Sequence, residues 1–256
     1  MLRAVLFDLD NTLILYSERQ FFDRYLPKVT EVFSDMMPPG IFAEKLILST
    51  QALMNNDGSK SNAEYFMNVF CSGYEGREEE IWTRFIEFYR TQFDEFRSLV
   101  TVPNGVRELF LRLKSKGIKT VIASNPIWPL YVQIKRLSWA GIDDLDFDLI
   151  THLENMSYCK PHIEYYEQIC QKIDEMPGEC LMVGNDPIND MGIASIGMKT
   201  FLVSDRDDID ESTIELTRKI RTDHATAEVL TPDFKGPLSR VPDIVETLLK
   251  SLKNNR

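Results

Sequence analysis

Two carboxylates separated by one residue follow an apolar run near the beginning of the sequence. Residues 2–7 are mostly apolar, and Asp8, Asp10 and Thr12 come directly after them. In a strand, side chains two residues apart point to the same face, so we expect Asp8 and Asp10 to begin on one face of the strand's carboxyl end. Two acids this close repel each other unless a cation or a proton compensates their charge. The pair therefore indicates chemistry rather than a purely structural role.

Three later segments also carry polar residues where an apolar run stops or a helix starts. The run 119–123 ends at Ser124 and Asn125, and Lys160 stands just before a segment of helical period. The run 180–184 is followed by two acids, Asp186 and Asp190. Open α/β sheets keep their active sites at the carboxyl ends of the strands. We therefore expect these residues to meet the first pair at one site.

This set of residue types suits phosphoryl transfer. A carboxylate nucleophile cannot approach a dianionic phosphate without charge compensation, and Mg²⁺ binds through carboxylates, phosphate oxygens and water. A hydroxyl, backbone N–H groups at a helix start and a lysine can hold the remaining phosphate oxygens. A second carboxylate can protonate the leaving alkoxide and later deprotonate water.

The elements that must position these residues are predicted by hydrophobic pattern. Apolar spacing predicts helices over 106–113, with Gly117 as the C-cap, and over 163–173, with Pro161 in the first turn. Strands that alternate with helices predict an α/β fold with a doubly wound parallel sheet. Runs rich in β-branched or aromatic residues predict five strands, at 3–8, 119–124, 147–152, 180–184 and 199–204.

The interval 15–99 breaks this alternation and predicts an inserted α-helical cap. The α/β core then comprises residues 1–14 and 100–256, and segments 38–40 and 55–59 are predicted turns within the cap. Aromatic residues at roughly helical spacing are expected to pack in the interior of the cap. They are Tyr65, Phe66, Phe70, Trp82, Phe85 and Phe88.

Composition narrows the classes of partner. The 256 residues carry a formal net charge of −11, which argues against a nucleic-acid or anionic-membrane surface. An acidic protein still binds a phosphate where the site has its own metal or lysine. The four cysteines lack CxxC spacing and predict reduced thiols. With no apolar stretch long enough for a membrane helix and no signal-peptide pattern, we expect a soluble, cytoplasmic protein.

Two other groups of residues are predicted to take no part in the reaction. The charged run 205–210 is expected to be a solvated loop. The three histidines show no metal-ligand spacing and are interpreted as structural or surface residues. They are His152, His162 and His224.

The four motifs, in this order and with a helical insertion between the first two, resemble the haloacid dehalogenase-like (HAD) hydrolase superfamily. The resemblance covers the whole chain except the cap's own sequence. It implies a HAD-like, Rossmannoid core in which Asp8 is the nucleophile that becomes an aspartyl phosphate and Asp10 is the general acid/base. It also implies that the Asp8 side chain and the Asp10 backbone carbonyl bind Mg²⁺.

The resemblance implies roles for the later motifs as well. Ser124 and the Asn125 amide would bind the phosphoryl group, and Lys160 would neutralise charge on both nucleophile and phosphate. Asp186 would complete the metal site, with Asp190 as a neighbouring partner or alternative ligand. Two positions depart from the pattern: residue 185 is Asn where many relatives carry an acid, and residue 162 is His where Asp is frequent.

Taken together, the residues and the resemblance predict a Mg²⁺-dependent phosphatase acting on a small phosphorylated metabolite. Metal-independent 2-haloacid dehalogenases of the superfamily lack an acid at the position of Asp10, so its presence favours phosphate chemistry. The alternatives are a sugar-phosphate mutase or a phosphonatase, which share the core residues and differ in the cap, or a non-catalytic regulatory member. The sequence predicts neither the substrate nor the oligomeric state.

Overall fold

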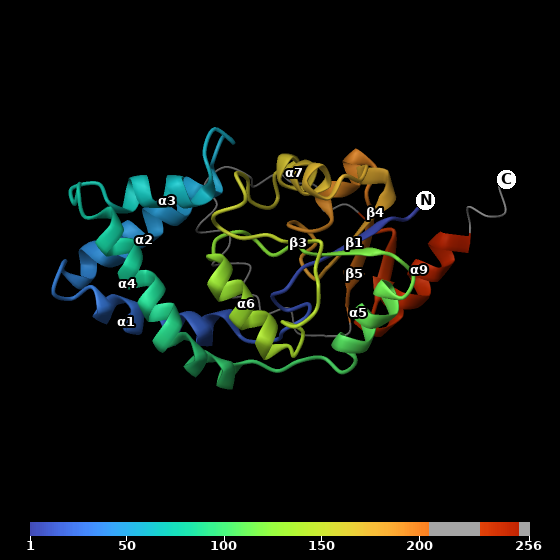
Figure 1. The fold of residues 1–256 in the computed structure, drawn as a ribbon, viewed down its shortest axis with the longest axis horizontal. Coiled ribbons are helices and arrows are strands. Elements are labelled where there is room, and N and C mark those ends of the chain that lie inside the picture. The colour runs from blue at the N-terminus through green and yellow to red at the C-terminus, as the bar shows by residue number, and fades with distance from the viewer. Residues whose placement is uncertain (205–230, 251–256) are drawn as a thin grey trace.

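The computed structural model describes residues 1–204 and 231–250, and a six-stranded parallel sheet forms its centre. The strand order is β3-β2-β1-β4-β5-β6, which confirms the predicted doubly wound α/β fold (Figure 1). The charged run 205–210 and His224 lie outside the described residues. The strands are β1 (Ala4–Phe7), β2 (Lys119–Ile122), β3 (Leu149–Ile150), β4 (Cys180–Gly184), β5 (Lys199–Val203) and β6 (Phe234–Gly236).

Strand β1 lies in the middle of the sheet and is buried throughout. Its last residue, Phe7, is in register with Ile122 of β2 and Val183 of β4. The segments that follow these three strands therefore leave the sheet at the same edge. Of the six strands, only β6 was not predicted, because its three residues include a single apolar side chain.

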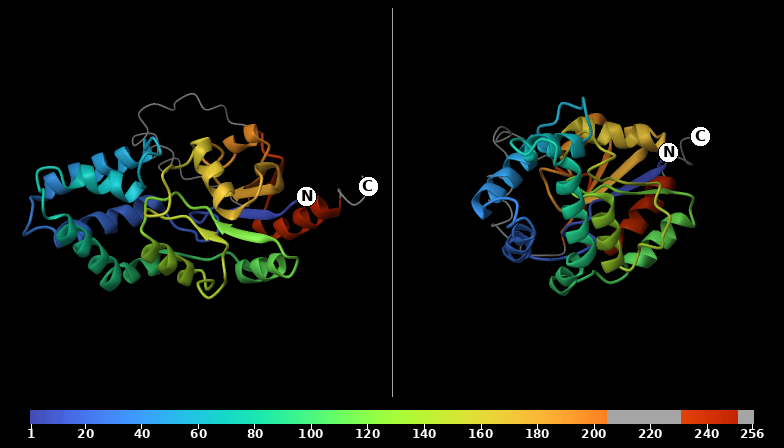
Figure 2. Two further views of the ribbon diagram at one scale, coloured as in Figure 1. Left: turned by 45° about the horizontal axis from the view of Figure 1, so that its top comes forward. Right: turned by 60° about the vertical axis from the view of Figure 1, so that its left-hand side comes forward.

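Helices cover both faces of the sheet (Figure 2). Val5 and Phe7 of β1 belong to the apolar cluster that includes α5 and α9, whereas Ala4 and Leu6 belong to the cluster that includes α7. This alternation is the strand period of two, and it explains why β1 is apolar on both faces. The helices are α5 (Val106–Lys114), α6 (Leu130–Trp139), α7 (Ile163–Ile173) and α9 (Val241–Lys250), with short 3₁₀ turns η2 (Pro177–Glu179), η3 (Gly192–Ile196) and η4 (Leu238–Arg240).

The two helices predicted from apolar spacing are confirmed as α5, which ends one residue later than predicted, and α7, but the prediction that Pro161 lies in the first turn of α7 is wrong. Gly117 lies beyond the last turn of α5, with φ of 68°, and its N–H donates to the Lys114 carbonyl at 3.0 Å. A positive φ is accessible to glycine without steric cost, which suits this position. Pro161 precedes the N-cap of α7, which is His162.

The regular elements between β1 and α5 are all helices, and Figure 1 shows them grouped at one end of the molecule. Two connecting segments lead into and out of this group of helices. They are joined at Leu15 and Thr101, which form two backbone hydrogen bonds with each other, each 2.9 Å long. The limits of the cap at 15 and 99 stay a prediction. The helices are α1 (Glu18–Val32), α2 (Pro39–Met54), α3 (Asn62–Phe70), α4 (Glu78–Thr91) and the 3₁₀ helix η1 (Phe93–Leu99).

Aromatic side chains form the interior of this helical group. Phe66, Phe70, Phe85 and Phe88 are buried as predicted, and the Phe70 and Phe85 rings lie 5.1 Å apart. Tyr65 and Trp82, from the same prediction, are only partly buried against this cluster. Edge-to-face aromatic contacts of this kind are favourable beyond the apolar area that they bury.

One of the two turns predicted in the cap is wrong. Residues 38–40 begin helix α2 instead, with Pro38 as the N-cap and Pro39 in the first turn. Proline suits that position because its fixed φ is helical and its missing N–H would have no partner there. The turn at 55–59 is confirmed: the Asp57 side chain accepts a 2.9 Å hydrogen bond from the Ser59 N–H.

The start of α3 is bonded directly to the core. The Asn62 N–H donates to the Met156 carbonyl at 2.8 Å, and the Ala63 N–H donates to the Leu153 carbonyl at 2.9 Å. The Asn62 side chain is fully buried, and its Oδ1 accepts a 2.9 Å hydrogen bond from Asn56 Nδ2. These bonds give the cap a third attachment to the core, besides the two connecting segments.

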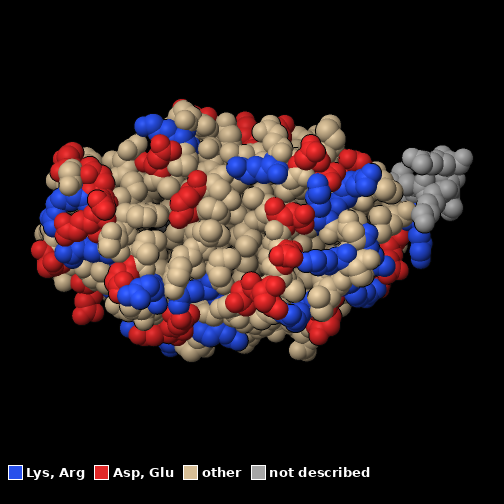
Figure 3. All heavy atoms as spheres, in the orientation of Figure 1, with Lys and Arg blue, Asp and Glu red and all other residues tan. Residues whose placement is uncertain are grey.

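The cysteines and two of the histidines lie within the described residues. All four cysteines are free and buried, His152 pairs with Glu154 at 2.6 Å, and His162 Nε2 lies 3.2 Å from the Met54 carbonyl oxygen. On the face shown in Figure 3, acidic and basic side chains are interspersed. Within residues 1–204 and 231–250, no helix has the length and apolar character of a membrane span.

The buried Asn62 gives a prediction about stability. Asn62→Ala removes one of the two acceptors of Asn56 Nδ2, the other being the Lys60 carbonyl, and we expect it to lower the free energy of unfolding by about 1–3 kcal/mol. Asn68→Ala is the control, because Asn68 is exposed on the same helix. Urea unfolding monitored by circular dichroism measures both variants. Equal midpoints for the two variants would show that the Asn62 anchor carries no stability.

Candidate active site

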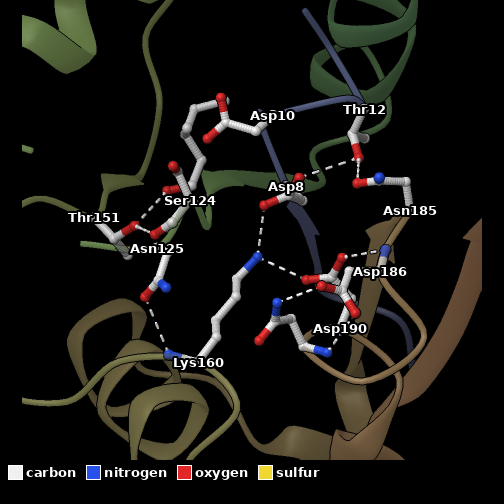
Figure 4. A network of polar contacts seen from close by, with 12 residues as sticks. Asp8, Asp10, Thr12, Ser124, Asn125, Thr151, Lys160, Asn185, Asp186 and Asp190 are labelled. Atoms are coloured by element: carbon white, nitrogen blue, oxygen red, sulfur yellow. Dashed lines mark hydrogen bonds and ion pairs between the residues drawn. The ribbon is translucent and has the colours of Figure 1, made fainter. Parts of the chain in front are cut away.

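The centre of the site is a buried lysine between two aspartates (Figure 4). Lys160 Nζ lies 2.7 Å from Asp8 Oδ1 and 2.7 Å from Asp190 Oδ1. All three side chains are buried. The fold thus brings together three of the residues predicted to carry the chemistry, from segments that are far apart in the sequence.

The sheet positions each of these side chains. Asp8 directly follows β1, and its N–H donates to the Val183 carbonyl of β4 at 2.9 Å. Lys160 lies between β3 and α7, and Asp190 lies in the turn after β4. Gly184 ends β4, and a Cβ at that position would lie 2.1 Å from Asp190 Oδ2. Only glycine leaves room for the Asp190 carboxylate beside the strand end.

Burial and charge shift the pKa values of these groups. Burial raises the pKa of Asp8 to about 7, with Asp190 and Asp10 adding to the rise and Lys160 opposing it. The pKa of Asp190 is also raised, chiefly by burial. Burial by itself would lower the pKa of Lys160, but Asp190 and Asp8 hold it well above its usual value. One ammonium does not fully compensate the acids, so another cation would be accommodated here.

Ser124 is a buried hydroxyl without a partner. Among the described residues no group is hydrogen-bonded to Ser124 Oγ, although the side chain is fully buried. Its carbonyl oxygen is held by Thr151 Oγ1 at 2.6 Å and by the Tyr165 hydroxyl at 2.9 Å. A buried polar atom is normally paired, and an unpaired one points to a ligand or to water. Next to it, Asn125 Oδ1 accepts a 3.3 Å hydrogen bond from the Lys160 N–H.

Two oxygen atoms suited to Mg²⁺ lie around the hydroxyl of Thr12. Thr12 Oγ1 is 3.2 Å from Asp8 Oδ2 and 3.1 Å from Asn185 Oδ1. Carboxylate and amide oxygens are hard ligands that Mg²⁺ accepts. Asn185 was not predicted as a ligand. Its position directly after Gly184, at a buried strand end, is the signal that could have identified it.

Asp186 is turned toward its own loop. Its Oδ1 accepts hydrogen bonds from the N–H groups of Ile188 at 2.8 Å and Asn189 at 3.0 Å, and its Oδ2 is bonded by Asn189 Nδ2. In the described part of the chain, no three His, Cys, Asp or Glu side chains are grouped as a metal site. Metal ligation by Asp186, Asp190 or the Asp10 carbonyl stays a prediction.

Asp10 does not share the surroundings of Asp8. Strand β1 ends at Phe7, and the chain then turns through Asn11, whose φ is 54°. The strand relationship between Asp8 and Asp10 is therefore lost, and the Asp10 carboxylate is bonded by Arg136 of α6 and by the Tyr16 hydroxyl. Neither partner was predicted. An arginine within an amphipathic helix, such as Arg136, has the pattern of a surface residue.

This chain is similar in sequence to a family of hydrolases and to two named phosphatases. The sequence model of the haloacid dehalogenase-like hydrolases matches residues 2–197. Glyceraldehyde 3-phosphate phosphatase of Methanothermobacter thermautotrophicus is 26% identical over 226 residues, which cover 85% of this chain and 95% of that protein. Pyrophosphatase PpaX of Bacillus cereus is 30% identical over 138 residues, covering 54% of this chain and 61% of PpaX.

A solved structure supports the same assignment at the level of fold. The HAD phosphatase from Thermococcus onnurineus superimposes with a TM-score of 0.55 at 19% sequence identity, over 95% of this chain and 98% of that one. The parallel sheet, the helical insertion and the family match over residues 2–197 agree. This chain therefore belongs to the haloacid dehalogenase-like hydrolases.

Proposed function

We propose that this chain is a Mg²⁺-dependent phosphatase that hydrolyses a small phosphorylated metabolite through an aspartyl-phosphate intermediate. The observation that carries the proposal is the Asp8 carboxylate bonded to Lys160 within a site that also holds the unpartnered hydroxyl of Ser124. These are a nucleophile, a cation and a free donor for a phosphoryl group. The names of the two curated relatives support phosphate as the group transferred.

The proposed reaction has two displacements at phosphorus. An oxygen of Asp8 attacks the phosphorus, the ester P–O bond breaks, and the Asp10 carboxyl gives its proton to the leaving oxygen. Water then attacks the phosphorus of the aspartyl phosphate and gives a proton to Asp10, and the bond to Asp8 breaks to release inorganic phosphate. Throughout, the Ser124 hydroxyl and the Lys160 ammonium hold the phosphoryl oxygens, whose charge is greatest in the transition state.

The donor set fits Mg²⁺. The Asp8 carboxylate, the Asn185 amide oxygen and the main-chain carbonyl of Asp10 would hold the ion, with the acids of the β4 loop close by. Bound there, Mg²⁺ would supply the charge compensation that lets a carboxylate approach a phosphate. The raised pKa of Asp8, caused first by burial and then by neighbouring acids, agrees with a site that lacks one positive charge.

Loss of the nucleophile tests the activity. We expect the purified protein to hydrolyse p-nitrophenyl phosphate with Mg²⁺, and Asp8→Asn to lower kcat by about a thousandfold or more, since no other group can form the intermediate. EDTA should abolish the activity and added Mg²⁺ should restore it. Asp146→Asn is the control, because its side chain is exposed and is paired with Lys114. Full activity of Asp8→Asn would exclude the proposed mechanism.

The metal ligands are tested by two neighbouring substitutions. Asn185→Ala removes an oxygen beside Asp8, and we expect it to raise the Mg²⁺ concentration for half-maximal activity by about 10-fold or more. Asp186→Asn keeps an acceptor for the loop N–H groups and should change that concentration less. Activity titrated with Mg²⁺ measures both. The reverse order would identify Asp186 as the direct ligand and Asn185 as a bystander.

A further inference from the structure

We propose that Arg136 is a positioning residue that holds the acid/base Asp10 in place through a partly buried ion pair. This inference rests on the proposed phosphatase function, in which Asp10 exchanges a proton with the leaving group and with water. Arg136 comes from α6, outside all four motifs, and no role follows for it from the motif pattern.

The Arg136 guanidinium is enclosed in the core and bonded at two of its nitrogens. Its side chain is 3% exposed. Nη2 is paired with Asp10 Oδ1, and Nη1 donates to Gln133 Oε1 at 2.8 Å. Gln133, itself fully buried, donates from Nε2 to the Thr151 carbonyl at 2.9 Å. A continuous chain of hydrogen bonds thus connects Asp10 to the end of the sheet.

Burying a guanidinium costs more free energy than burying an apolar side chain of the same size. Removing this charge from water is unfavourable unless partners with good geometry compensate it. Here the compensating anion is Asp10: burial by itself would lower the pKa of Arg136, but Asp10, with smaller contributions from Tyr16 and Asp8, raises it above its usual value. The planar guanidinium bonds two acceptors in fixed directions, which an ammonium cannot do. Arg136 and Asp10 therefore restrict each other to one geometry.

The two oxygens of Asp10 are held differently. The Arg136 guanidinium and the Tyr16 hydroxyl both donate to Oδ1. In the described part of the chain, no side chain or backbone N–H is hydrogen-bonded to Oδ2. The arrangement fixes the carboxylate through one oxygen and leaves the other to exchange a proton with substrate or water. Figure 4 shows Asp10 apart from the Asp8, Lys160 and Asp190 group, so its position depends on these separate partners.

The proposal predicts a loss that depends on the leaving group. An alkoxide leaves with a proton from Asp10, whereas p-nitrophenolate is a weak base and leaves without one. Because general acid catalysis is worth about 10²–10⁴-fold, we expect Arg136→Met to lower kcat/KM for an alkyl phosphate by about 100-fold. For p-nitrophenyl phosphate the loss should be about fivefold or less. Arg107→Met, which removes an exposed arginine paired with Asp144, is the control.

Two measurements separate positioning from a general structural role. Arg136→Lys keeps the charge without the second hydrogen bond, and we expect it to recover part of the alkyl phosphate activity. Inhibition by orthovanadate reports on the Ser124 and Lys160 phosphate site, and its inhibition constant should be unchanged in Arg136→Met. Equal losses for both esters, accompanied by weaker orthovanadate inhibition, would overturn the proposal.

If Arg136→Met does not fold, a milder substitution tests the same proposal. Tyr16→Phe removes only the second donor to Asp10 Oδ1, and we expect a smaller loss with the same preference for the alkyl ester. Without that preference, the proposal fails. Wild-type protein inactive on both esters would refute the phosphatase function itself. Active wild type with variants that lose both activities equally would refute only the role of Arg136.

Discussion

The site depends on one buried interaction, the Lys160 ammonium between the carboxylates of Asp8 and Asp190. Three charges removed from water are stable only when their geometry is good, because the attraction must offset a large desolvation cost. The two 2.7 Å contacts meet that condition. The contacts form only when β1, β4 and the segment before α7 have this arrangement. The ion pairs therefore favour the same arrangement of the sheet that brings the three side chains together. Gly184 is part of this constraint, since it makes room for Asp190.

The fold and the centre of the site could be predicted from the sequence for a simple physical reason. Strands buried on both faces are apolar without interruption, so a polar residue at the end of such a run stands out. Asp8, Ser124 and Asp190 were identified in this way, and the parallel order of the strands then brought their carboxyl ends together. Lys160 lacked a strand end of its own and was expected at the site from its place before a predicted helix and from the strand pattern between it and Asp186, and the resemblance to the family supplied its role.

The residues that were missed share a different property, because their roles come from partners distant in the sequence. Arg136 lies 126 positions from Asp10, and nothing in helix α6 distinguishes it from a solvated arginine. Asn62 has the pattern of an ordinary residue at a helix start, yet it is buried against the core. Asn185 was set aside as a departure from the family, although its amide oxygen and Asp8 both accept from the Thr12 hydroxyl. Local pattern carries no information about such contacts.

The repulsion between Asp8 and Asp10 is compensated by separate cations, although Asp10 still adds to the rise of the Asp8 pKa. The chain turns after β1, so each acid has its own buried cation: Lys160 for Asp8 and Arg136 for Asp10. A shared cation would give the two carboxylates similar surroundings, whereas separate cations allow different tasks. In the proposed reaction, the acid bonded to Lys160 would attack the phosphate, and the acid bonded to Arg136 would use its other oxygen for proton exchange. Tyr16 precedes α1, the first helix of the cap, and its hydroxyl is bonded to Asp10, so the proposed acid/base is linked to the segment that leads into the cap.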